Sequence, residues 1–64
     1  MTTNAEMYMK CMQIESMVRT MVMKGINDNS KLVEAVDNLY HPTNEGEMEI
    51  FSEAIIYAKQ SVLN

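Results

Sequence analysis

The stretch EIFSEAIIYAKQSVLN, residues 49–64, decides the fold because it has the pattern of a helix with more than one apolar face. Apolar side chains recur in it at intervals of four, three and four residues, which places them on one side of a helix. These residues are Phe51, Ile55, Ala58 and Val62. Ala54 and Tyr57 lie beside that face, whereas Ile56 lies about 140° away, on the polar side. The position of Ile56 predicts a second apolar surface.

The beginning of the chain has a similar pattern. Thr3 followed by Glu6 fits a capping box at the start of a helix, and Lys24 followed by Gly25 fits its end. One apolar seam consists of Met7, Cys11, Ile14, Val18 and Met21. Three more methionines lie off that seam, namely Met9, Met12 and Met23. We therefore predict an N-terminal helix within residues 1–26 that is apolar over a wider arc than one partner helix covers.

Two further helices are predicted after a turn with the sequence INDNS. The first runs from about Ser30 to Tyr40 and ends there because Pro42 disfavours a helical conformation in the preceding residue. Its apolar positions are Leu32, Val36 and Leu39, with Val33 and Tyr40 flanking them. The last helix begins after Asn44 or Thr43, either of which can form a cap with Glu47.

These patterns together predict an all-α fold, with residues 1–64 forming a single helical domain. Short connections make consecutive helices antiparallel neighbours. We therefore expect an N-terminal helix at residues 1–26 and an antiparallel helical hairpin at residues 30–64, in which the second and third helices pair.

The length of 64 residues suggests that the domain needs additional support, because domains of this size are marginally stable alone. Cys11 is the only cysteine, so no internal disulfide can form. With a single histidine, His41, the chain also lacks the four ligands of a closed zinc site. Oligomerisation is the support that remains, and we predict a homo-oligomer.

The apolar residues that lie away from the predicted core indicate what such an oligomer buries. Ile56 and Leu63 form a narrow edge on the last helix, and the off-seam methionines widen the apolar surface of the first. The chain has eight methionines, whose flexible side chains suit adaptable contacts. An alternative stays open, in which methionine only fills irregular gaps in the core of a monomer.

Charge excludes some partners. The net charge is −4. Residues 1–32 carry four basic and three acidic side chains, whereas residues 33–64 carry one basic and six acidic side chains. An acidic chain is a poor candidate for binding duplex nucleic acid, which is driven by phosphate neutralisation. The mild basic excess of the first half suits a small anionic ligand.

The sequence also predicts a cytoplasmic location and no membrane partner. Glu6 and Lys10 interrupt the apolar residues near the start, and no apolar run approaches the length of a membrane span or forms a secretory signal. In a reducing compartment we expect Cys11 to be a buried apolar side chain rather than a reactive thiol.

Catalytic chemistry has weak support. Glu45, Glu49 and Glu53 share one helix face, where a carboxylate pair can bind a divalent ion, but acids at a helix start are usually caps and solvated surface. His41 has no evident second ligand, and no glycine-rich phosphate loop is present. We therefore expect a protein that is not an enzyme and has no metal or cofactor.

Four residues are candidates for holding an anionic nucleotide ligand. Tyr8 can stack on a base, and Lys10 can contact a phosphate. Lys24 and Asn27 lie at the opposite end of the same helix, some 25 Å away by helical rise. Antiparallel packing of two copies would bring Tyr8 of one copy near Lys24 of the other. The competing interpretation is that Tyr8 packs on a neighbouring side chain and the lysines are solvated.

The segment KLVEAVDNLYHPTNEGEMEIFSEAIIYAKQSVLN, residues 31–64, resembles the helical hairpin of the phage anti-CBASS sponges, which is shared with an anti-Thoeris sponge. Pro42 matches a proline in the turn, and SEAIIYA matches a Glu-Glu-Ala-apolar-apolar-Trp-Ala segment. The matched positions are Pro42, Glu53, Ala54, Tyr57 and Ala58. Ser52 replaces the first acid, and Tyr57 replaces the tryptophan. TNEGE replaces a Ser-Arg-Glu stretch, so its arginine is missing, and the distance from Pro42 to Glu53 is about one helical turn shorter.

This resemblance implies a non-catalytic sponge of the bacterial host cytoplasm. Members of that family are homo-oligomers, commonly hexamers, that bind cyclic di- and trinucleotide immune signals between protomers without cleaving them. The resemblance therefore implies an assembly from dimer to hexamer. The ligand residues proposed above come from chemistry and helix geometry, not from a matched motif. The alternative function is that of a small phage or bacterial protein that inhibits or modulates a host protein through a Met-rich face.

Overall fold

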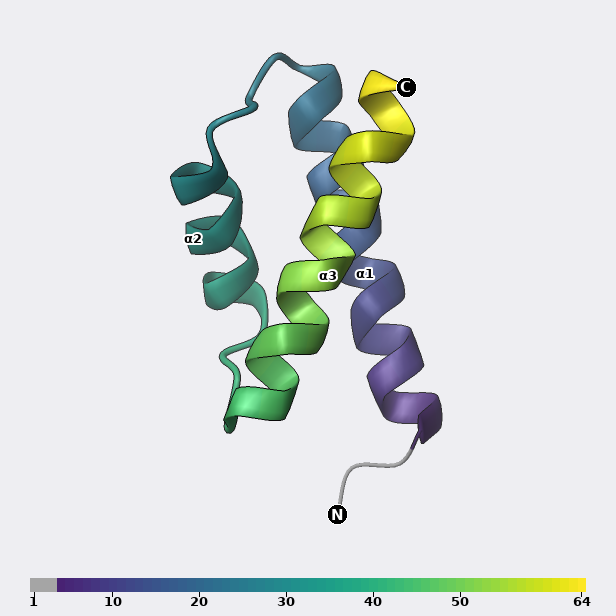
Figure 1. The fold of residues 1–64 in the computed structure, drawn as a ribbon, viewed down its shortest axis with the longest axis vertical. Coiled ribbons are helices and arrows are strands. Elements are labelled where there is room, and N and C mark those ends of the chain that lie inside the picture. The colour runs from purple at the N-terminus through teal and green to yellow at the C-terminus, as the bar shows by residue number, and fades with distance from the viewer. Residues whose placement is uncertain (1–3) are drawn as a thin grey trace.

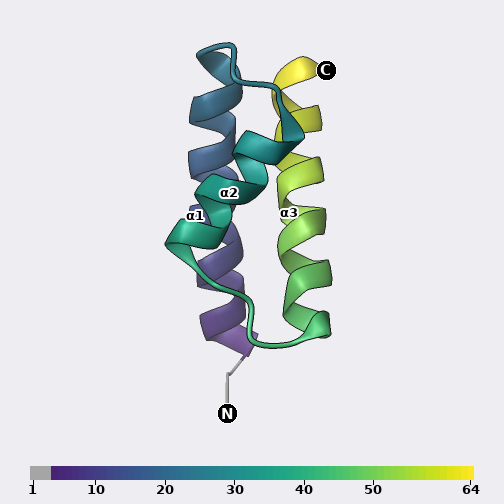
Figure 2. The same ribbon diagram turned by 90° about the vertical axis from the view of Figure 1, so that its left-hand side faces the viewer.

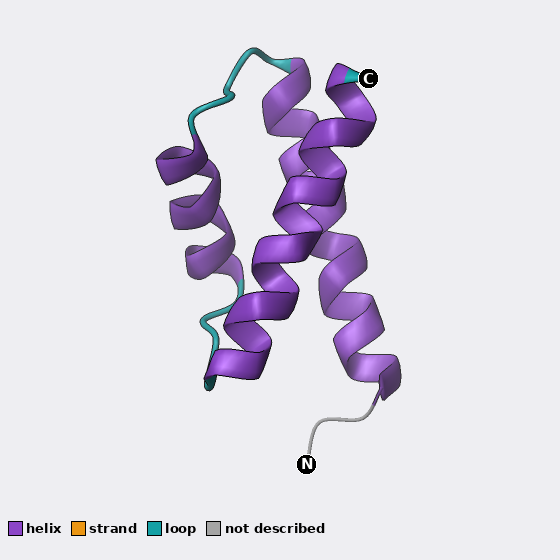
Figure 3. Cartoon of the chain, viewed as in Figure 1, coloured by secondary structure: helices purple, strands orange, loops and turns teal. Residues whose placement is uncertain are grey.

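A computed structural model describes residues 4–64, which form three α-helices and no strand within that range (Figure 3). Helix α1 spans Asn4–Met23, α2 spans Asn29–Leu39 and α3 spans Glu45–Leu63. The predicted all-α class is confirmed, with bounds close to the expected ones. The predicted capping box at Thr3 and Glu6 lies outside the described residues, because Thr3 is not among them.

The helices are arranged in two layers. Helices α1 and α3 run in the same direction and α2 runs in the opposite one (Figure 1). Most of the contact between helices joins α1 to α3, and α2 contacts each of them modestly. Figure 2 shows α2 lying across the α1–α3 pair on one side. The main partner of α3 is therefore α1, whereas the sequence analysis expected α2.

The core lies where the three helices meet. It consists of the buried residues Ile14, Val18, Val22, Leu32, Val36, Phe51, Ala54, Ile55 and Ala58. The predicted faces of all three helices contribute to it, although Cys11, Met21 and Val62 are only partly buried. Valine, isoleucine and leucine hold defined rotamers, so this small core is built from stiff side chains.

Two residues near the predicted core face are exposed instead. Tyr57 on α3 is 61% exposed. Leu39 is 42% exposed in the last turn of the short helix α2. Ile56 and Leu63 are each more than half exposed, as expected for one copy of the chain.

The end of α1 is fixed by a Schellman motif. The Ile26 N–H donates to the Met21 carbonyl at 3.0 Å, and the Gly25 N–H donates to the Val22 carbonyl at 2.9 Å. Gly25 has a φ of 94°, the left-handed conformation predicted for it. This turn places Ile26 against the core, where it is partly buried.

The starts of α2 and α3 are capped by side chains. Asp28 Oδ1 accepts a hydrogen bond from the Ser30 N–H at 2.9 Å. Asn44 Oδ1 accepts one from the Glu47 N–H at 2.9 Å, and Glu47 Oε1 accepts from both the N–H and the hydroxyl of Thr43. Both caps that the sequence offered for the third helix are therefore in use, in a reciprocal arrangement.

Polar contacts fasten the end of α3 to the rest of the chain. Arg19 Nε donates to Ser61 Oγ at 3.0 Å. Lys59 Nζ donates to the Asn27 carbonyl at 2.9 Å and to Asn29 Oδ1 at 3.1 Å. The Arg19 bond joins α1 to α3, and the Lys59 bonds hold the connection between α1 and α2 against the last turns of α3.

Candidate ligand-binding face

The side of α1 that faces away from the core carries an uncharged stripe. The stripe recurs at intervals of four, three, four and seven residues and consists of Ala5, Met9, Met12, Ser16 and Met23, all exposed. We call this set the outer stripe. The position that would continue the spacing between Ser16 and Met23 is Arg19, whose guanidinium is held by Ser61 and by Glu15. The outer stripe therefore resembles one side of a helix pair without its partner.

Methionine is concentrated on or near this surface rather than in the core. Met23 is 72% exposed and Met12 is 55% exposed. No methionine within residues 4–64 is buried, and three of them only pack at the margin of the core, namely Met7, Met17 and Met21. Filling of the core thus does not account for the exposed methionines.

Tyr8 and Lys10 point to different sides of α1, although they are close in sequence. Tyr8 is 57% exposed. The Lys10 ammonium lies 5.5 Å from the centre of the Tyr40 ring, in cation–π contact on the side covered by α2. The Tyr40 hydroxyl in turn donates to Gln13 Oε1. The sequence did not reveal this cluster, because it depends on how α2 lies across α1.

Lys24 and Asn27 are both exposed at the far end of α1. The Asn27 carbonyl accepts from Lys59, which leaves its side-chain amide at the surface. Tyr8 and Lys24 are separated by about 24 Å of helical rise. One protomer therefore does not bring the four predicted ligand residues together.

The groove between α2 and α3 is too small for a nucleotide. Its volume is about 110 Å³, whereas pockets for drug-sized ligands typically hold about 300–1,000 Å³. Other hollows on the described residues are larger, such as one of about 390 Å³ beside Ile56, Lys59 and Leu63.

Three titratable side chains, Cys11, Glu47 and His41, have surroundings that the structure defines. Burial raises the pKa of the Cys11 thiol, and the nearby Glu15 carboxylate raises it further, so the thiol stays protonated at neutral pH. The hydrogen bonds from the Thr43 N–H and hydroxyl lower the pKa of Glu47. His41 Nδ1 lies 3.0 Å from Asp37 Oδ1 on the exposed surface.

Within residues 4–64, no three His, Cys, Asp or Glu side chains gather as a metal ion would require. In the same part of the chain, no helix is long and apolar enough to span a membrane. Comparison with known proteins found no family model, no curated protein and no solved structure that matches this chain.

Proposed function

We propose that this chain is a non-catalytic sponge that works as a homo-oligomer and holds a cyclic di- or trinucleotide between protomers. The observation that carries the proposal is the outer stripe, which is exposed and, apart from the interruption at Arg19, uncharged. Tyr8 lies near one end of it and Lys24 near the other. The resemblance of residues 31–64 to phage sponges supports the ligand class and, with it, a role in the cytoplasm of a bacterial host.

The outer stripe suggests how two copies meet. In an antiparallel pair of α1 helices, Met12 can face Met23 of the partner subunit. Residue numbers rise along one helix as they fall along the other, so the same register puts Tyr8 near the end of the partner's α1, which the loop residue Asn27 follows. Lys24 then lies one residue from the level of the partner's Lys10. Each end of the pair thus receives ligand groups from both copies, as the two-fold symmetry of such a dimer requires.

The chemistry of these residues suits a cyclic nucleotide. The Tyr8 ring can stack on a base, and the Asn27 carboxamide can pair with its polar edge. The Lys24 ammonium supplies a point charge for a phosphodiester. None of these groups breaks a phosphodiester bond, so the ligand would leave intact.

Calorimetric titration with a panel of cyclic di- and trinucleotides tests the ligand class. At least one member should bind with measurable heat and be recovered intact after the protein is denatured. Tyr8→Ala and Lys24→Ala should each weaken binding about ten-fold, since stacking on an aromatic ring contributes roughly 1–3 kcal/mol per base. Absence of heat with every member at high protein concentration would overturn the sponge function.

Light scattering tests the assembly separately. The mass should be a multiple of 7.3 kDa. Met12→Glu should reduce it, whereas Met48→Glu serves as a matched control because Met48 on α3 is 56% exposed, against 55% for Met12. Ile56→Glu should reduce any assembly larger than a dimer, since Ile56 offers a second apolar edge. A mass of one chain in the unmodified protein would contradict the proposal.

A second candidate function is that of a modulator whose outer stripe docks on a groove of another protein. The observation that favours it is the exposure of flexible methionines, which adapt to more than one partner. A monomer that binds no cyclic nucleotide, and whose Met12→Glu variant stays folded, is the result that would support this candidate over the sponge.

A further inference from the structure

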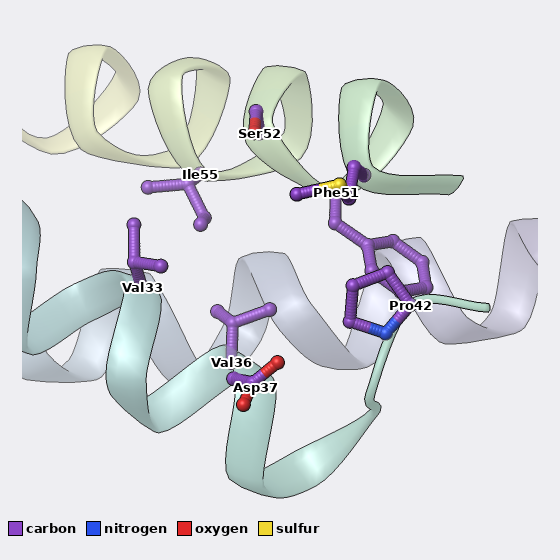
Figure 4. Close-up of a pocket in the computed structure, with 8 residues that line it drawn as sticks. Val33, Val36, Asp37, Pro42, Phe51, Ser52 and Ile55 are labelled. Atoms are coloured by element: carbon purple, nitrogen blue, oxygen red, sulfur yellow. The ribbon is translucent and has the colours of Figure 1, made fainter. Parts of the chain in front are cut away.

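The groove between α2 and α3 lies away from the outer stripe and has a purely apolar floor. Val36, Phe51 and Ile55 form the floor and are buried, with exposed fractions of 3%, 4% and 6%. Val33 from α2 and Met48 from α3 form the two walls, and each is more than half exposed. Figure 4 shows Val33 and Val36 facing Ile55 across the groove.

The groove is open because α2 lies against α3 only modestly. Pro42, in the connection between α2 and α3, lies beside Phe51 at one end of the groove (Figure 4). Its volume of about 110 Å³ is close to the roughly 150 Å³ of an apolar cavity that binds benzene. It therefore has room for one aliphatic side chain and not for a nucleotide.

Two carboxylates of α2 lie at this groove. Asp37 lines the groove itself, and Glu34, one helical turn earlier, lies with Val33 and Asp37 beside an adjoining hollow. Asp37 Oδ1 lies 3.0 Å from His41 Nδ1. The described side chains that line the groove include no lysine or arginine.

We propose that the α2–α3 groove binds a basic segment of a partner protein, with one leucine-like side chain in the groove and flanking lysine or arginine over Asp37 and Glu34. The apolar floor gives the affinity, since a side chain placed there removes Val33 and Met48 from water. The acidic rim attracts the segment and selects against acidic ones. This site is separate from the outer stripe, so it does not depend on the proposed sponge function.

The test uses three synthetic 12-residue helical peptides carrying a fluorophore. The first has one central leucine flanked by four lysines in an alanine–glutamine background. In the second the leucine is replaced by alanine, and in the third the lysines are replaced by glutamate. Fluorescence anisotropy should show the first peptide binding at least ten-fold more tightly than either other, with affinity falling as salt is raised.

Two variants, each of which introduces one lysine, identify the surface that binds the peptide. Val33→Lys should weaken the first peptide at least ten-fold, whereas Met9→Lys, on the outer stripe and also more than half exposed, should leave its affinity unchanged. Circular dichroism should show both variants folded. Equal affinity for the leucine and alanine peptides, or equal losses in both variants, would overturn the proposal.

Light scattering on the same variants identifies a competing occupant. If Val33→Lys lowers the mass of the unliganded protein and Met9→Lys does not, a second copy of this chain fills the groove and the partner-segment proposal fails. If the mass is the same in Val33→Lys and in the unmodified chain, while peptide binding is lost, the partner-segment proposal stands.

Discussion

The two sides of α1 are built from different side chains. The inner side carries Ile14, Val18 and Val22, all buried, whereas the outer side carries Met12 and Met23, both more than half exposed. Side chains branched at Cβ have few rotamers and specify one packing, while methionine is flexible and tolerates several. The fold therefore depends on the stiff side of the helix, and the adaptable side is the one that we propose for contacts with other molecules.

The largest expected effect comes from truncating one residue on each side. Ile14→Ala should lower the free energy of unfolding by about 2–5 kcal/mol, because Ile14 is fully buried and its removal leaves a cavity. Met12→Ala should change it by no more than about 0.5 kcal/mol. Urea unfolding at low protein concentration measures both without a contribution from self-association. Equal losses would erase the distinction between the two sides.

A smaller effect is expected at the residue that ends α1. Gly25→Ala should cost about 1–2 kcal/mol, because its φ of 94° is unfavourable for residues with a Cβ. A Cβ there would meet no atom within 4 Å, so the cost is one of backbone conformation alone. Gly25→Asn should cost less, since asparagine tolerates this conformation better. Thermal unfolding of the two variants checks that alanine is the more destabilising substitution. Steric crowding would instead make the larger asparagine more destabilising.

A pH dependence is expected from the start of α3. The pKa of Glu47 is lower in the folded chain than in the unfolded chain, so the ionised carboxylate stabilises the fold above its unfolded pKa of about 4.3. That contribution is lost as the pH falls from about 5 through the folded pKa. Glu47→Gln should therefore be less stable at neutral pH and show a flatter pH profile. Urea midpoints between about pH 3 and pH 7 provide the measurement.

The smallest expected effect concerns the methionines themselves. Met9→Leu combined with Met12→Leu preserves apolar surface on the outer stripe and should change the free energy of unfolding by less than about 0.5 kcal/mol. If flexibility matters for binding, the double variant should lose affinity for its ligand or partner while its stability stays the same. Unchanged binding would show that apolar area alone is what the outer stripe provides.

Much of the local structure could be predicted from the sequence because it depends on nearby residues. The left-handed Gly25 and the caps at Asn44 and Glu47 follow from interactions a few residues apart. The pairing of α1 with α3 could not be predicted, since periodicity shows which face of a helix is apolar but not which helix covers it. The exposure of Tyr57 and the Lys10–Tyr40 contact could not be predicted for the same reason.

The candidate site divides in a similar way. The sequence identified the exposed edge at Ile56 and the methionines off the core seam, because both follow from helical spacing. It did not identify the α2–α3 groove, which exists only because a short helix lies imperfectly on a longer one. The apolar residues Val33 and Met48 were visible in the sequence. That they line one groove follows only from the arrangement of α2 and α3.

The parallel pairing of α1 and α3 has a consequence for how the chain is made. Arg19 and Ser61, which meet across this pair, are 42 positions apart in the sequence. Contacts between such distant segments require closure of a long loop, which slows folding relative to a local helical hairpin. Because α3 is synthesised after α1 and α2, α1 has to wait until α3 has emerged from the ribosome before it meets its main partner. Until then the apolar surfaces of α1 are exposed to chaperones and to other nascent chains.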